Sequence, residues 1–125
     1  MKDAKRPTDA ELAILRVFWS RGPSTVRQIA AEMRREGAYT TVLKLLQIMT
    51  EKGLVERDEA QRSHVYAAAY SEDHTQKQLV GDLLARAFDG SAAKLVLHAL
   101  EAGSASPEEI ADIRKLLDKH RGGRR

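Results

Sequence analysis

The apolar residues of this 125-residue chain change their spacing twice along the sequence. From about residue 9 to 52 they recur every three or four residues, as on one face of a helix, and between residues 54 and 67 they alternate in short runs. Helical spacing returns from residue 71 to about residue 120. This order predicts three short helices, a hairpin and three further helices, which is a mainly α fold with a small β component.

Start and stop patterns divide the first helical stretch. Thr8 and Glu11 have the spacing of a capping box, in which each side chain accepts a hydrogen bond from the backbone amide of the other residue. The pattern predicts a first helix over residues 9–21, stopped by an Arg-Gly-Pro sequence. Ser24 is expected to cap a second helix that ends near residues 35–37.

A third helix and a hairpin follow. The third helix is expected over residues 39–52, with Gly53 as its left-handed C-cap. Residues 54–57 and 63–67 contain β-branched and aromatic residues in rough alternation on either side of a polar turn. Two short helices joined by a turn and followed by a hairpin are typical of a winged helix-turn-helix. In that fold the third helix enters the major groove of DNA and the hairpin lies along the backbone.

The outer side of the third helix and the hairpin turn carry the candidate DNA contacts. The stripe expected to face the core consists of Val42, Leu45, Leu46 and Met49. Hydroxyls, Gln and Lys suit base edges or phosphates, and an exposed Ile can contact a thymine methyl. An ordinary solvated helix face and a plain charged turn would have the same composition. The candidate DNA-binding residues are Tyr39, Thr40, Thr41, Lys44, Gln47 and Ile48 on the helix, Arg62 at the tip of the hairpin, and Ser63 and His64 beside it.

Three further helices are expected behind the hairpin. The first spans residues 71–89 and the second lies between Ser91 and Gly103. The third begins at Pro107, where a serine one position earlier repeats the capping pattern with a glutamate. We expect residues 1–6 and 121–125 to be disordered, the latter as a Gly-rich tail with three positive charges.

These C-terminal helices hold more apolar side chains than a single copy can cover. A domain of about 70 residues that fills its own core cannot also bury them, so a second copy of the chain is their simplest cover. We therefore expect a DNA-binding domain over residues 1–70 and a helical dimerisation domain over residues 71–125. The residues expected at the dimer interface are Leu79, Leu83, Leu84, Phe88, Leu95, Leu97, Leu100, Ile110, Ile113, Leu116 and Leu117.

Charge is distributed unevenly between the two parts. Residues 1–70 hold 12 Lys and Arg against 9 Asp and Glu, whereas residues 71–120 hold 6 against 9. A positive front part suits a polyanionic partner, although a balance of this size is common in proteins that bind no nucleic acid.

Several classes of function are disfavoured by composition. The chain has no cysteine, which excludes disulfides and thiolate metal sites. His64, His74, His98 and His120 lack metal-ligand spacing, so we expect neither a metal nor a cofactor. Gly-rich phosphate loops and nucleophile elbows are missing, which argues against an enzyme. Without a secretory signal or an apolar run of about 18 residues, we expect a cytoplasmic protein that does not insert into membranes.

Four short motifs resemble one family of regulators. They are Pro7-Thr8-Asp9-Ala10-Glu11-Leu12, Tyr39-Thr40-Thr41-Val42, Glu51-Lys52-Gly53-Leu54-Val55 and His64-Val65-Tyr66. In order and spacing, over about residues 7–120, the chain resembles the penicillinase and methicillin-resistance repressors of the BlaI/MecI type. The resemblance implies a homodimer on a dyad-symmetric DNA operator, with the third helix as reader, the wing on phosphates and the C-terminal helices as the dimer clamp.

The resemblance also bears on how such a repressor is switched off. In the family a membrane sensor with a zinc metalloprotease arm triggers cutting in the fifth helix, at an Asn-Phe bond in the best-known members. The matching pair here is His98-Ala99, which departs from that pattern. Copper sensing through a cysteine cluster, known in some relatives, is excluded. The alternative hypothesis is a winged-helix protein-interaction module without specific DNA binding.

Overall fold

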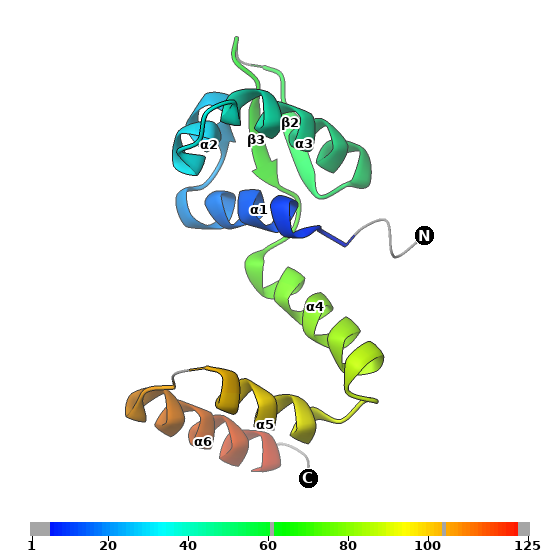
Figure 1. Cartoon of the computed structure of the whole chain (residues 1–125), viewed down its shortest axis with the longest axis vertical. Helices are drawn as coiled ribbons and strands as arrows, with labels where there is room; N and C mark the ends of the chain where they lie inside the picture. Colours follow the sequence, from blue (N-terminus) through cyan, green and yellow to red (C-terminus); the bar gives the residue numbers. More distant parts are fainter. Residues whose placement is uncertain (1–5, 61, 104, 123–125) are drawn as a thin grey trace. The chain divides into compact units, whose positions relative to one another are not determined.

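Helices flank a small sheet in the first of two units into which the chain divides, Met1–Val80 and Gly81–Arg125 (Figure 1). The computed structural model describes residues 6–60, 62–103 and 105–122. The first unit contains α1 (Asp9–Arg21), β1 (Ser24–Thr25), α2 (Val26–Met33), α3 (Ala38–Lys52), β2 (Val55–Asp58) and β3 (Val65–Ala68). Then α4 (Glu72–Ala87) crosses the boundary, and α5 (Ala92–Ala102) and α6 (Pro107–Gly122) follow. The predicted mainly α fold with a small antiparallel sheet is confirmed.

The start of α1 has the predicted capping box. The Thr8 amide donates to Glu11 Oε1 at 2.9 Å, and the Glu11 amide donates to Thr8 Oγ1 at 3.2 Å. The same Glu11 oxygen accepts a hydrogen bond from Lys52 Nζ at 2.7 Å, and the glutamate is only 2% exposed. This buried pair fastens the first turn of α1 to the last turn of α3.

The predicted cap of α2 is wrong by one residue. Thr25, the second residue of β1, is the N-cap and forms a capping box with Gln28. The Ser24 hydroxyl donates to the Gly22 carbonyl at 2.9 Å, and the Ser24 backbone pairs with Tyr66 of β3. Because the helix begins at Val26, Thr25 is the residue directly before it and takes the N-cap position.

The turn between α2 and α3 begins earlier than expected. We predicted an end near residues 35–37, but α2 stops at Met33 because Arg34 adopts a left-handed conformation with φ of 56°. At the other end of α3 the predicted C-cap is confirmed. Gly53 has φ of 81°, and its amide donates to carbonyls of the last turn.

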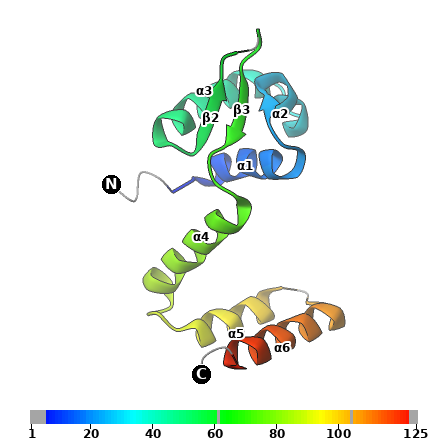
Figure 2. The same ribbon diagram turned by 180° about the vertical axis from the view of Figure 1, so that it is seen from behind.

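The sheet has three antiparallel strands in the order β1-β3-β2. The predicted hairpin is present with its strands shifted by a residue or two: Val55 pairs with Ala68 and Asp58 with Val65. Ser63 and His64, expected in the second strand, lie in the turn before it. The short β1 was not predicted. Figure 2 shows the hairpin in front of α3, with α2 beside it, in the view from behind.

The core of the first unit lies where the three helices meet the sheet. Its buried side chains are Ile14, Leu15, Phe18, Val26, Ile29, Val42, Leu46, Met49, Leu54, Val55 and Tyr66. Leu45, expected in the buried stripe of α3, is only partly buried and packs at the edge of this cluster. The other three residues of the predicted stripe are fully inside.

In the second unit the predicted caps are present. The Lys94 amide donates to Ser91 Oγ at 3.1 Å at the start of α5, and the Glu109 amide donates to Ser106 Oγ at 3.1 Å at the start of α6. We expected residues 121–125 to be disordered, but α6 continues through Gly122. The rest of that segment, and residues 1–5, lie outside the described part of the chain.

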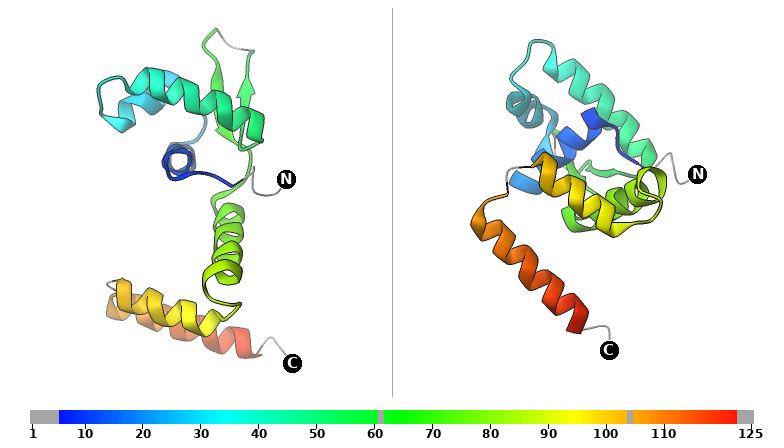
Figure 3. Two further views of the ribbon diagram at one scale, coloured as in Figure 1. Left: turned by 45° about the vertical axis from the view of Figure 1, so that its right-hand side comes forward. Right: turned by 60° about the horizontal axis from the view of Figure 1, so that its bottom comes forward.

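The second unit has no buried core of its own among its described residues. From residue 81 to 121 no described residue is buried, and Leu116 and Leu117 are 65% and 61% exposed. The helices α5 and α6 run in roughly opposite directions, as the right-hand view in Figure 3 shows. Consequently α5 and α6 leave apolar side chains uncovered in the single chain.

Candidate nucleic-acid interface

The outer face of α3 presents the side chains that the sequence predicted there. Thr40, Thr41, Lys44 and Gln47 are exposed. Tyr39 and Ile48, the two large residues of the set, are 47% and 39% exposed. Val42, Leu46 and Met49 hold the opposite face of the helix in the core. The arrangement presents hydroxyl, amide, ammonium and aliphatic groups together on one rigid element.

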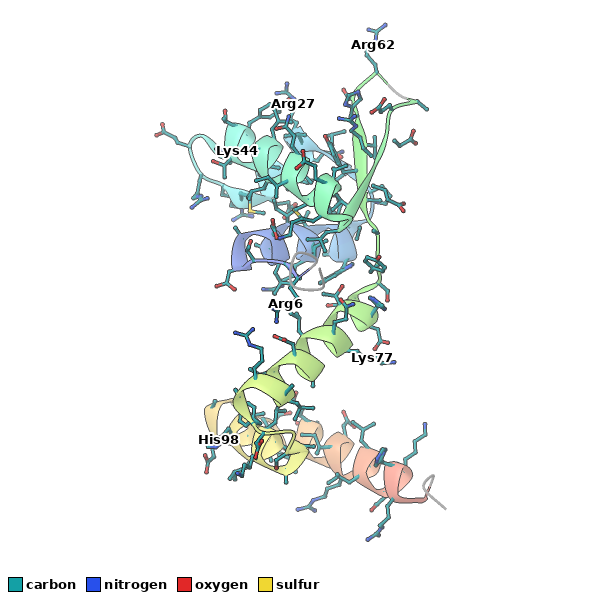
Figure 4. The ribbon with its side chains drawn as sticks, turned by 90° about the vertical axis from the view of Figure 1, so that its right-hand side faces the viewer. Arg6, Arg27, Lys44, Arg62, Lys77 and His98 are labelled. Carbon is teal, nitrogen blue, oxygen red and sulfur yellow. The ribbon has the colours of Figure 1, made fainter. Side chains whose placement is uncertain are left out.

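Lys44 has no carboxylate partner within the described ranges of the chain. The other lysine of α3, Lys52, is in contrast committed to the buried carboxylate of Glu11. Figure 4 shows Lys44 projecting from α3 away from the core. Its ammonium group is therefore free to contact an external acceptor, whether a base edge or a phosphate.

The wing places its three predicted site residues at its exposed tip. Arg62, Ser63 and His64 are all exposed. The turn is shaped partly by Asp58, whose Oδ1 accepts a hydrogen bond from the Ala60 amide at 2.9 Å. Gln61 lies outside the described residues.

A further arginine of the wing is already engaged within the protein. Arg57 is hydrogen bonded to Tyr66, its neighbour across the strands, and forms an ion pair with Glu59. The hydrogen bond to Tyr66 first, and the contact with Glu59 second, raise the pKa of Arg57 above its ordinary value. Arg57 therefore stays cationic, with its charge balanced by a local carboxylate.

A cleft of about 410 Å³ lies between the start of α2, the start of α3 and the wing. It is lined by Thr25, Val26, Arg27, Tyr39, Leu43, Arg62, Ser63, His64 and Tyr66. The pairing of Thr25 with Val65 joins β1 to the wing strand and so brings these segments together. Four of the predicted site residues thus share one concave surface with residues of α2.

Arg27 lines this cleft and was not among the residues predicted from the sequence. Its guanidinium carbon lies 5.8 Å from the centre of the Tyr39 ring, within cation–π range. Figure 4 shows Arg27 and Arg62 pointing away from the core at the same end of the first unit. The available signal was its position between the buried Val26 and Ile29, which places it on the outer side of α2.

The expected dimerisation residues form no site within one chain. Leu83, Leu97 and Leu100 are exposed, as are Leu116 and Leu117. Leu79, Leu84, Phe88, Leu95, Ile110 and Ile113 are half-buried. His98 and Ala99 lie in the middle of α5, and His98 Nδ1 is 3.6 Å from Glu101 Oε1.

No group of three or more potential metal ligands occurs within the described residues. In the same part of the chain, no helix has the length and apolarity needed to cross a membrane.

The sequence pattern that defines the penicillinase repressors matches residues 7–119, nearly the whole chain. The chain belongs to the penicillinase repressor family. It is 36% identical to the transcriptional regulator BlaI of Mycobacterium tuberculosis (strain ATCC 25618 / H37Rv), over 98% of this chain and 91% of that protein. It is 24% identical to the penicillinase repressor of Bacillus licheniformis, over 97% and 96% of the two chains. The predicted family resemblance is thereby confirmed.

More distant relatives include the methicillin resistance regulatory protein MecI of Staphylococcus aureus (strain N315). It is 21% identical over 90% of this chain and 93% of its own length. The penicillinase repressor family consists of transcriptional repressors and not of enzymes, as the sequence also predicted.

Proposed function

We propose that this repressor binds a dyad-symmetric DNA operator as a homodimer, with α3 in the major groove and the wing on the phosphate backbone. The observation that carries the proposal is the outer face of α3, where exposed polar side chains stand on a helix anchored by Val42, Leu46 and Met49. A helix of this kind fits the width of the major groove, and rigid anchoring keeps its contacts in register.

Different residues have different tasks in this proposal. Thr40, Thr41 and Gln47 hydrogen bond to base edges, Ile48 contacts a thymine methyl, and Lys44 reaches a guanine or a phosphate. Tyr39, at the start of α3, borders the cleft beside the wing. Arg62, Ser63 and His64 contact the backbone and set the register of the protein on the duplex.

The dimer is formed by the C-terminal helices. Their apolar side chains are uncovered in one chain, and burying a leucine stabilises an interface by about 1.5–3 kcal/mol. Two copies related by a twofold axis then present two α3 helices to the two halves of a palindrome.

The decisive experiment measures binding to duplex fragments from the chain's own promoter at several salt concentrations. For about six phosphate contacts the logarithm of the binding constant falls with the logarithm of salt at a slope of about −5. A scrambled duplex of equal length is the control for sequence specificity. The rival function, a winged-helix protein-interaction module, predicts no preference for the promoter fragment and little response to salt.

For derepression we propose cutting of α5 at His98-Ala99, triggered by a membrane sensor metalloprotease. Both residues are exposed, but they lie within a continuous helix, which must unwind before a protease can bind the bond in extended form. The test is incubation of tagged repressor with extract from induced cells. A fragment ending near residue 98 supports the proposal, and loss of full-length protein without that fragment contradicts it.

A further inference from the structure

Two arginines from different segments line the cleft between α2 and the wing. Arg27 extends from the first turn of α2, and Arg62 lies in the wing tip. We propose that Arg27 and Arg62 hold the same phosphate of the operator backbone, as a clamp with one arm on α2 and the other on the wing. This inference rests on the proposed DNA binding and adds a residue, Arg27, and a defined ligand group.

The charges of the clamp are not balanced inside the protein. Within the described ranges neither Arg27 nor Arg62 forms an ion pair, and no Asp or Glu lines the cleft. Two other arginines of this unit are neutralised: Arg21 pairs with Glu32 at 3.0 Å, and Arg57 pairs with Glu59. The cleft therefore concentrates uncompensated positive charge, which an anion from outside would balance.

The cleft is also built so that little has to move when the anion binds. The Tyr39 ring lies 5.8 Å from the guanidinium carbon of Arg27 and restricts where that side chain extends. Hydrogen bonding of β1 to β3 places Ser24 opposite Tyr66 and fixes the start of α2 against the wing strand. Such preorganisation lowers the entropy lost on binding.

A phosphodiester is the anion that this geometry favours. A guanidinium group is a planar fork of N–H donors that matches phosphate oxygens, and two forks can share one phosphate. The hydroxyl of Ser63 and the ring of His64 add neutral hydrogen-bonding groups at the same edge. The cleft adjoins Tyr39 on the outer face of α3, so the DNA strand that borders the groove would pass it.

The test compares Arg27→Ala, Arg62→Ala and the double variant with the wild type on one operator duplex at several salt concentrations. Each single variant should weaken binding about tenfold at low salt. If both arginines hold one phosphate, the salt slope of each single variant should change by much less than 1, because the remaining arginine still neutralises that phosphate, and the double variant should lose about 1 from the slope. Arg16→Ala, which removes an exposed arginine of α1, is the matched control and should leave the slope unchanged.

The outcomes separate the clamp from the proposed function. A wild-type protein that ignores the operator contradicts DNA binding itself, whereas wild-type binding with an unaltered operator affinity of Arg27→Ala overturns only the clamp. A slope reduced by about 2 in the double variant assigns the arginines to separate phosphates and overturns the sharing. In a last experiment inorganic phosphate competes with the operator duplex at constant ionic strength. Competition that is seen with the wild type and lost in the double variant would assign the cleft to a free anion. Circular dichroism of each variant checks that the fold is intact.

Discussion

Glu11 links two helices through one carboxylate oxygen. That oxygen accepts hydrogen bonds from the Thr8 amide, which caps α1, and from Lys52 Nζ at the end of α3. A buried carboxylate keeps its charge at low cost only while such donors remain. The orientation of α3, and of every side chain on its outer face, is therefore tied to the first turn of α1.

This arrangement makes Lys52→Met destabilising. The substitution preserves much of the aliphatic side chain but leaves the Glu11 carboxylate with a single amide donor, so we expect the free energy of unfolding to fall by about 1–3 kcal/mol. The control is Lys77→Met, which removes an ion pair whose two side chains are 79% and 77% exposed. That change should stay within about 0.5 kcal/mol. Urea denaturation measures both, and equal effects would contradict the buried pair.

Lys44→Ala distinguishes base reading from phosphate contact. If the ammonium group binds a guanine, the variant loses more affinity for the operator than for a scrambled duplex, by about 1–3 kcal/mol. If it binds a phosphate, both affinities fall alike and the salt slope decreases by about 1. Fluorescence anisotropy with the two duplexes gives the comparison, and unchanged operator affinity would remove Lys44 from the interface.

At the scale of helices and strands, the sequence predicted the features that depend on residues close together in the chain. The Thr8 capping box and the Gly53 cap depend on residues within one turn of each other, and both are present. The pairing of β1 with β3 joins Ser24 to Tyr66 across 42 positions. A strand of two residues is too short to show the alternation of apolar and polar residues that would predict it. Because this pairing was missed, the cap of α2 was misplaced by one residue.

The same limit explains which site residues were found. The exposed face of α3 follows from helical spacing alone. Five outward residues were therefore predicted correctly: Thr40, Thr41, Lys44, Gln47 and Ile48. Arg27 becomes notable only because β1 carries it to the cleft beside Tyr39 and Arg62. Long-range pairing is not visible in the spacing of a single sequence.

Two glycines give opposite predictions for the same substitution. Gly53→Ala should lower the free energy of unfolding by about 1–2 kcal/mol, because φ of 81° is unfavourable for alanine although no atom lies within 4 Å of the added Cβ. Gly81→Ala, inside α4 and equally uncrowded, should raise the free energy of unfolding by about 0.5–1 kcal/mol, because alanine favours a helix interior more than glycine does. Thermal unfolding followed by circular dichroism measures both. A loss at Gly81 would instead indicate close approach of another chain there.

At the scale of the whole molecule, the two units differ in how they hide apolar surface. The first unit buries a continuous cluster from α1, α2, α3 and the sheet. Among described residues the second unit buries none, and leucines of α4, α5 and α6 remain exposed. The composition of the C-terminal helices predicted these uncovered apolar side chains. Which of them meet in a dimer depends on contacts between two copies, which the spacing of residues in one sequence does not encode.

Leu116→Asp tests the proposed dimer directly. A charge in place of a 65% exposed leucine changes little in a lone chain, but in a dimer interface it should weaken association more than tenfold. The matched control is Ala111→Asp, which makes the same change of charge at another exposed position of α6. Sedimentation at micromolar concentration measures both, and a wild-type chain that sediments as a compact monomer would rule the dimer out.

The uncovered leucines of α6 also have a consequence for the lifetime of the protein in the cell. Chaperones and proteases bind exposed apolar segments, so a newly made chain without a second copy is open to capture and degradation. Survival of each chain would then increase with the number of chains already present. A gene expressed at a low level would yield disproportionately little repressor.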